Sequence, residues 1–169
     1  KSCVVTIPAF EHGVPVGETL FYPAHKVTVQ PTLAFGCPVE ASGGFDPQFA
    51  PSRVTDGVSD QMSAYWLAYP APQTLTIDLG RVQRVGRVEV VAFWVTQSQA
   101  RYRIEAGADR ERWTTLVSES EAPGPATKDG YVHQFPPVEA RYLRFVTARG
   151  AQFPSTMMRI NEIRAYEGL

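Results

Sequence analysis

Apolar and polar residues alternate along the middle of the chain. In residues 74–79 (TLTIDL) threonine alternates with leucine and isoleucine, and in residues 85–93 (VGRVEVVAF) valine alternates with arginine and glutamate. A period of two residues is typical of a β-strand that buries one face. The intervening residues 80–84 are too few for a crossover helix, so we expect an antiparallel or corner connection.

Two more pairs of strands are predicted downstream, followed by a last strand. The first pair comprises residues 102–106 and 113–117, the second comprises residues 131–135 and 141–147, and the last strand covers residues 160–166. Short strands at this spacing, with turn residues between them, predict an all-β sandwich or barrel. The 14 prolines and 13 glycines favour turns over long helices.

The first 31 residues differ from the rest of the chain. Their short apolar runs are interrupted by Pro8, Pro15, Pro23 and Pro31, and proline is tolerated at the edge of a sheet but not in its centre. We therefore expect an N-terminal extension or linker with one or two short edge strands over residues 1–31. A β-sandwich domain over residues 32–169 follows it.

Composition narrows the class of protein. An apolar content of 44% with 20% charged residues is typical of a globular chain and not of a disordered one. The net charge of −1 gives no reason to expect nucleic acid or an anionic membrane as partner. We also find no apolar run long enough to span a bilayer.

The two cysteines, Cys3 and Cys37, allow two interpretations. They are either free thiols, or a disulfide that ties the N-terminal segment to the domain. A disulfide would suit an exported protein, but two cysteines do not decide between these alternatives by their number alone.

The sequence does not indicate a catalytic domain. His12, His25 and His133 are scattered, and neither a His-x-x-x-His nor a Gly-x-Ser-x-Gly motif nor a glycine-rich phosphate loop occurs. A glycosidase needs two carboxylates facing each other across a cleft, and a small sandwich offers few clefts. We therefore expect no catalysis by this chain alone.

Several motifs occur in an order typical of one family. They are VTDG (54–57), Trp66, PQTLTIDLG, RVGRVEVVAF, YRIEAGADRERW, ARYLRFVTARG and NEIRAY. In these motifs residues 39–167 resemble the discoidin, or coagulation factor V/VIII type C, domain superfamily, and among its members bacterial carbohydrate-binding modules most closely. The resemblance implies a galactose-binding-like jelly roll of about eight antiparallel strands. It also implies that Trp66 and Trp113 are core residues, and we expect Asp78 to be hydrogen-bonded near a turn and not catalytic.

The resemblance further implies a structural calcium ion near the Asp-Gly turn. Calcium takes about six to eight oxygen ligands, a mixture of carboxylates and carbonyls. Carried over to this chain, the ligands are the carbonyls of Arg53 and Val58, the carboxylates of Asp56, Asp60 and Glu162, and the hydroxyl of Ser63. The chain departs from the family in having Val58 where an acidic or amide residue is usual. The alternative is that Asp56 only caps the turn and Glu162 pairs with an arginine.

A sugar site is implied on the loops at one end of the sandwich. Such a site needs an aromatic face for the C–H side of the sugar ring and polar side chains for its hydroxyls. The loops offer Trp94, Gln97, Arg149, Phe153, Phe45 and Tyr65. Each has an alternative role: Phe45 could pack its loop onto the sandwich and Tyr65 could belong to the core beside Trp66. We interpret His133 as a surface or structural histidine.

Three functions fit these observations. The first is a secreted, non-catalytic carbohydrate-binding module that targets an attached enzyme or a cell surface to glycans with galactose- or glucose-type sugars. The second is a discoidin-type domain that adheres to protein or lipid, because Phe153, Met157 and Met158 lie near Arg149 and Arg159. The third is a structural accessory domain packed on a catalytic domain.

Overall fold

The structure, a computed structural model, describes residues 10–11, 14–15, 32–43, 47–70, 72–95, 100–121, 124–147 and 157–168. The chain divides into two compact units, Lys1–Pro31 and Thr32–Leu169. In the first unit β1 (Phe10–Glu11) and β2 (Val14–Pro15) pair with each other in an antiparallel sheet of their own. The extension or linker with edge strands expected over residues 1–31 stays a prediction.

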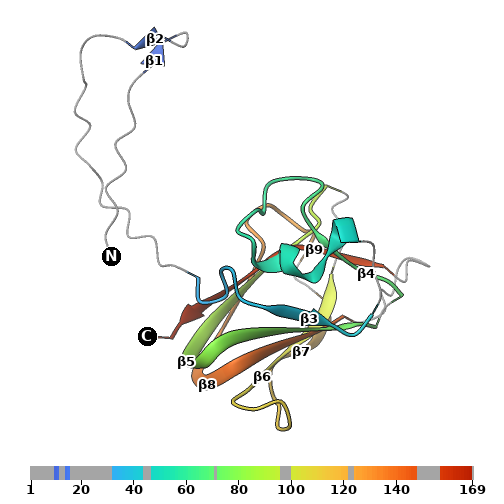
Figure 1. Cartoon of the computed structure of the whole chain (residues 1–169), viewed down its shortest axis with the longest axis vertical. Coiled ribbons are helices and arrows are strands. Elements are labelled where there is room, and N and C mark those ends of the chain that lie inside the picture. The colour runs from blue at the N-terminus through green and yellow to red at the C-terminus, as the bar shows by residue number, and fades with distance from the viewer. Residues whose placement is uncertain are drawn as a thin grey trace. The chain divides into compact units, whose positions relative to one another are not determined.

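The second unit is built from antiparallel strands and two short 3-10 helices (Figure 1). The elements are β3 (Val39–Ala41), η1 (Pro47–Phe49), η2 (Pro51–Thr55), β4 (Trp66–Ala68), β5 (Thr74–Ala92), β6 (Arg101–Gly107), β7 (Thr114–Glu121), β8 (Tyr131–Thr147) and β9 (Met158–Glu167). Hydrogen bonds connect them in the order β4-β9-β5-β8-β6-β7, and β3 pairs with β5. The predicted all-β antiparallel fold is confirmed.

β5 and β8 run side by side as one long ribbon, where the sequence predicts four separate strands. β5 contains both predicted runs and the residues between them, and β8 likewise joins the second predicted pair. The register of the ribbon shifts between Asp78 and Gln83, and Gly80 between them has a φ of +81°. The expected connection is thus a bend within a continuous strand, which glycine permits because a positive φ costs it little.

The bend brings the two ends of the ribbon together. Tyr102 pairs with Thr147 at the end of β8, yet its ring centroid lies 6.4 Å from that of Tyr131 at the start of β8. The domain therefore has two distinct ends. The loop end comprises residues 69–70, 72–73, 93–95, 124–130 and 157, and the bend end comprises residues 80–84, 107–113 and 136–139.

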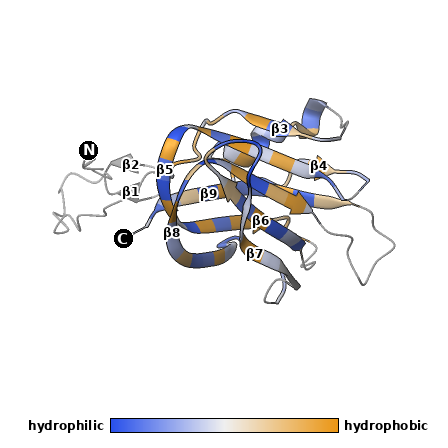
Figure 2. Ribbon diagram, turned by 90° about the horizontal axis from the view of Figure 1, so that it is seen from below, coloured by the Kyte–Doolittle hydropathy of each residue, from blue (hydrophilic) through white to orange (hydrophobic). Residues whose placement is uncertain are grey.

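The core lies between the two arms of this ribbon. Figure 2 shows hydrophobic and hydrophilic residues alternating along the strands, as a half-buried strand requires. The largest fully buried hydrophobic side chains are those of Trp66, Leu75, Ile77, Ile104, Ile160, Val54, Val85, Val88, Val90 and Val91. Trp66 is thus a core residue, as predicted.

Trp113 is not a core residue, which corrects the prediction made for it. Its ring is half-buried on the outer face of the sheet, and the Arg144 guanidinium lies 4.0 Å from the ring centroid. Arg144 and Arg103 both pair with Glu105 beside it. Stacking under a guanidinium thus replaces burial in the interior.

A β-bulge in β9 decides which side chains of this strand face outward. The register against β5 shifts at Asn161, whose fully buried side chain donates from Nδ2 to the carbonyl of Gln61. The extra residue interrupts the alternation, so Ile160 and Ile163 both belong to the core. Glu162 is thereby directed towards the segment that follows η2.

The cysteines and the helices add two observations. Cys37 is a free cysteine whose Sγ donates to the carbonyl of Leu33 at 3.3 Å, and Cys3 lies outside the described residues. In the described part of the chain, no helix has the length and apolar character needed to cross a membrane.

Candidate functional site

The turn after η2 has the conformation that its sequence predicts. Asp56 Oδ1 accepts a hydrogen bond from the backbone N–H of Val58 at 2.9 Å, and Gly57 has a φ of +82°. The exposed ring of Phe35 covers Gly57, where an added Cβ would lie only 2.8 Å from ring carbon Cε2. Both the backbone angle and this contact therefore require glycine.

Glu162 is buried beneath this turn, with 1% of its surface exposed. Its Oε2 accepts a hydrogen bond from the Gly57 N–H at 3.2 Å. Burial first, and the negative charge of Asp56 second, raise the pKa of the Glu162 carboxyl to about 8. Two carboxylates are thus held close together in a place where their mutual repulsion is poorly screened.

The structure brings together some of the predicted calcium ligands but not all. Asp56 is half-buried and Glu162 is buried beside it, whereas the side chains of Asp60 and Ser63 are exposed. Within the described residues, no hydrogen bond or ion pair joins Asp60 or Ser63 to either carboxylate. The Arg53 guanidinium lies 3.4 Å from Asp56 Oδ2.

The donor set fits a hard cation that accepts backbone oxygens. Among the described residues, no cluster of three or more His, Cys, Asp or Glu side chains could hold a metal ion. Two carboxylates therefore need carbonyl oxygens to complete a site. Calcium takes such mixed oxygen ligands readily, in contrast to zinc, which prefers nitrogen and sulfur.

Aromatic side chains from three segments meet at one side of the loop end. Tyr65 stacks on Phe49 with a centroid distance of 4.6 Å and an interplanar angle of 7°, and it meets Phe93 edge-on at 5.4 Å. The Arg159 guanidinium lies 5.0 Å from the Phe93 centroid and 5.6 Å from the Tyr65 centroid. We call these four half-buried residues the aromatic-arginine cluster.

Trp94 lies next to this end of the domain and is anchored by its own hydrogen bond. The indole Nε1 donates to the carbonyl of Ser59 at 3.3 Å, and the half-buried ring packs against the core. The Lys128 ammonium lies 4.5 Å from the ring centroid. Its ring is therefore fixed in place and partly covered by a cation.

Residues 38–160 match the family model of the F5/8 type C domain, and this match decides the family of the chain. The chain belongs to the F5/8 type C domain family. The named resemblance to discoidin-type domains is thereby confirmed.

Solved structures similar to this F5/8 type C domain include several carbohydrate-binding modules. A pectin-binding module has a TM-score of 0.67 and 24% identity, with 83% of this chain and 94% of that chain covered. The family 32 module of NanJ from C. perfringens, in complex with galactose, has a TM-score of 0.65 and 18% identity, covering 82% and 100%. Chitosan-binding module 1 of a chitosanase/glucanase from Paenibacillus sp. IK-5 has a TM-score of 0.56 and 25% identity, covering 80% and 98%. No curated protein sequence matches the chain.

Of the predicted sugar ligands, the structure describes Tyr65 and Trp94. Gln97, Arg149, Phe153 and Phe45 lie outside the described residues. Tyr65 is neither a core residue beside Trp66 nor an isolated ring, because it belongs to the aromatic-arginine cluster.

Sequence reasoning did not include Phe93 or Arg159 among the sugar ligands, and it considered Arg159 only for adhesion to protein or lipid. Both belong to or adjoin predicted strands, where an aromatic residue or an arginine is unremarkable. Their contact with Tyr65 depends on the fold, so the sequence contains no local signal for it.

His133 has a structural role in this F5/8 type C domain. Its Nε2 lies 2.6 Å from the hydroxyl of Tyr102, a residue with 3% of its surface exposed. Burial lowers the pKa of His133, and burial likewise raises the pKa of Tyr102. The pair joins β6 to the beginning of β8.

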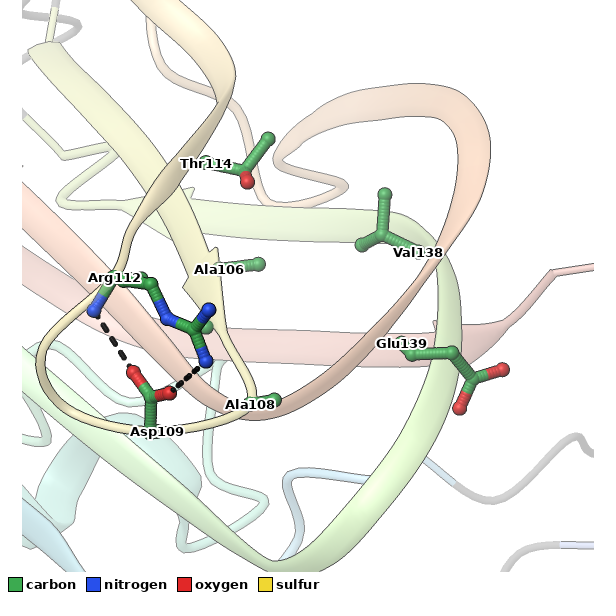
Figure 3. A pocket seen from close by; sticks show the side chains of 8 residues that line it. Ala106, Ala108, Asp109, Arg112, Thr114, Val138 and Glu139 are labelled. Carbon is green, nitrogen blue, oxygen red and sulfur yellow. Dashed lines mark hydrogen bonds and ion pairs between the residues drawn. The ribbon is translucent and has the colours of Figure 1, made fainter.

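The bend end carries a shallow cleft of about 330 Å³, lined mostly by the β6–β7 turn. In Figure 3 Asp109 and Arg112 form an ion pair on one side and Glu139 stands on the other, with its carboxylate turned away. Its floor is small and apolar, formed by Ala106 and Gly107. Asp78 lies near this end, accepts from the Gly80 N–H and pairs with Arg141, as a structural aspartate would.

Proposed function

We propose that this domain is a non-catalytic carbohydrate-binding module that binds glycans at its loop end. The aromatic-arginine cluster is the observation that carries the proposal. Aromatic rings contact the C–H face of a sugar, and a guanidinium donates hydrogen bonds to its oxygens. Family membership and the sugar-binding proteins among similar structures support the same function.

The predicted ligands Trp94, Gln97, Arg149, Phe153 and Phe45 remain part of the proposal together with Tyr65. The exposed side chains of Tyr69 and Met157 add apolar surface at the same end, with 54% and 44% of their surface exposed. An open site of this kind recovers little apolar burial, so we expect weak binding of a single sugar chain. Attachment to an enzyme would then raise the local concentration of that enzyme on a glycan surface.

The domain is proposed to work outside the cell as part of a larger polypeptide. One similar module comes from a chitosanase/glucanase, which supports a connection to a catalytic domain. We propose that the glycan contains sugars of galactose or glucose type. No reaction is assigned to this chain, because recognition of a glycan requires no bond to be broken.

Calorimetric titration tests the function directly. Galactose-, glucosamine- and galacturonate-containing oligosaccharides are titrated into the wild type and into Tyr65→Ala and Trp94→Ala. We expect binding of at least one oligosaccharide, weakened more than about tenfold, or about 1.4 kcal/mol, in Tyr65→Ala. Trp113→Ala is the matched control, since it removes an indole far from the loop end, and its affinity should equal that of the wild type. Absence of heat with every oligosaccharide would reject the function.

We further propose that a structural calcium ion binds beneath the Asp-Gly turn. Asp56 and Glu162 would supply carboxylate oxygens, and the carbonyls of Arg53 and Val58 would supply further oxygens. Asp60 and Ser63 complete the proposed set. The bound ion would supply positive charge that neutralises the two adjacent carboxylates and fixes the turn.

A further inference from the structure

The arginines of the domain are, as a rule, paired with carboxylates. Ion pairs hold Arg53, Arg87, Arg103, Arg110, Arg112, Arg141, Arg144 and Arg164. Most of these side chains are also well exposed to solvent, such as that of Arg112 at 88%. A carboxylate thus neutralises each of these eight guanidinium groups. Arg81 and Arg84 make no such pair within the described residues, but both are exposed to water.

Arg159 departs from this rule. Its side chain is half-buried, and no ion pair joins it to a carboxylate of the described residues. Its Nε is buried and has no hydrogen-bond partner in the described part of the chain. The rings of Tyr65 and Phe93 attract the charge, but their faces offer no hydrogen-bond acceptor to match the planar fork of the guanidinium.

Arg159 lies near the loop end of the domain. It lies on the second residue of β9, opposite Leu67 of β4, and next to Met157 at the loop end. Phe49 and Tyr65 form a stacked pair beside it. A guanidinium with no carboxylate partner among the described residues therefore lies beside aromatic rings that a sugar could contact.

We propose that Arg159 binds an anionic substituent of the glycan, so that the domain prefers acidic sugars to neutral ones. This inference rests on the glycan-binding function proposed above. A carboxylate or a sulfate ester accepts two parallel N–H donors from a guanidinium, an arrangement that a single hydroxyl does not reproduce. The ligand would then supply the anionic partner that carboxylates of the protein supply for eight of its other arginines.

The test uses sugars that differ only in charge. α-1,4-linked trigalacturonate and the neutral α-1,4-linked galactotriose are titrated into the protein at low and at high salt, and galactose 6-sulfate distinguishes sulfate from carboxylate recognition. We expect at least one anionic sugar to bind about tenfold or more tightly than its neutral counterpart. The advantage should shrink as salt rises.

Variants assign that preference to Arg159. In Arg159→Gln the affinities for the anionic and neutral sugars should become equal, and Arg159→Lys should retain part of the difference because it keeps the charge without the planar fork. Arg81→Gln removes an exposed arginine at the bend end and should behave as the wild type. Thermal unfolding of each variant verifies that it is folded, and Arg159→Lys alone carries the test if Arg159→Gln does not fold.

Three results would overturn the inference. Equal wild-type affinity for charged and neutral sugars would reject it while leaving glycan binding intact. An equal loss of both sugars in Arg159→Gln would also reject it, because the residue would then act without regard to charge. Binding to vesicles of anionic phospholipid with no sugar bound at all would reject the inference and the glycan-binding function together.

Discussion

Glu162 Oε2 accepts a hydrogen bond from the backbone N–H of Gly57 at 3.2 Å, although 105 positions separate the two residues. This contact ties the Asp-Gly turn to β9. It exists because the bulge at Asn161 directs Glu162 out of the core and under the turn. The consequence is a buried carboxyl group whose charge state affects the stability of the domain.

Without metal, the free energy of unfolding should fall as the pH rises from about 4.5 to about 8. Burial and the charge of Asp56 raise the pKa of Glu162 from 4.5 to about 8, so the folded state holds this proton more tightly than the unfolded state does. The stabilisation by the proton on Glu162 is complete below pH 4.5 and is lost as the pH rises through 8. Urea unfolding in EDTA across this range measures the slope.

Calcium should reverse the loss of stability at high pH, because the bound ion would take the place of the proton on Glu162. We expect added Ca²⁺ to raise the melting temperature more at pH 8.5 than at pH 5, since the ligands must be deprotonated. Glu162→Gln keeps an acceptor for the Gly57 N–H but not the titrating group. It should flatten the pH slope attributed to Glu162 and abolish the stabilisation by Ca²⁺. Equal stabilisation in wild type and variant would rule out Glu162 as a ligand.

Gly57→Ala should destabilise the domain more than Gly36→Ala. Both glycines have a positive φ, +82° and +68°, so both substitutions cost about 1 kcal/mol or more of backbone strain. Only at Gly57 would the new Cβ meet a ring, that of Phe35 at 2.8 Å, whereas nothing lies within 4 Å at Gly36. Urea unfolding compares the two variants, and equal losses would show that Phe35 moves aside freely.

His133 should titrate below its ordinary value of 6.5, because burial lowers its pKa. The unfolded state then binds the proton more tightly, so this group lowers the stability as the pH falls below 6.5. An NMR titration of the imidazole measures its pKa, and unfolding in the Glu162→Gln background removes the opposing contribution of Glu162. His133→Gln should lose the acid-dependent slope. An imidazole pKa above 6.5 would contradict the buried hydrogen bond to Tyr102.

Replacing Trp66 should destabilise the domain more than replacing Trp113, although both were predicted to be core residues. Trp66 is 1% exposed, and Trp66→Ala should cost about 3–5 kcal/mol or prevent folding. Trp113 is half-buried under Arg144, and Trp113→Ala should cost only about 1 kcal/mol, the scale of a lost cation–π contact with some packing. Chemical unfolding measures the free energy of unfolding of each variant. Similar losses would show that Trp113 contributes as a core residue does.

Alternation of side chains was sufficient to predict the faces of the strands but not their continuity. Leu75, Ile77 and Leu79 are buried as their period predicts. The residues after them read as a turn because they combine glycine with charged side chains, yet the ribbon continues through them with only a shift in register. A bend and a turn have the same local composition, and only the partner strand distinguishes them.

The candidate site was less predictable than the fold for a physical reason. The Asp-Gly turn is local, so the cap by Asp56 and the positive φ of Gly57 follow from adjacent residues. Arg159 meets Tyr65 and Phe93 only after the strands have paired. That no carboxylate of the described residues pairs with it is likewise a property of the folded surface and not of any sequence motif.

An NMR titration tests the central claim, that a glycan binds at the loop end, most directly. Amide and side-chain signals are followed while trigalacturonate or chitotriose is added to the ¹⁵N-labelled protein. We predict shifts concentrated at Tyr65, Phe93, Trp94 and Arg159, with none at the bend-end residues 107–113. Shifts concentrated at the bend end, or none with either sugar, would contradict the account.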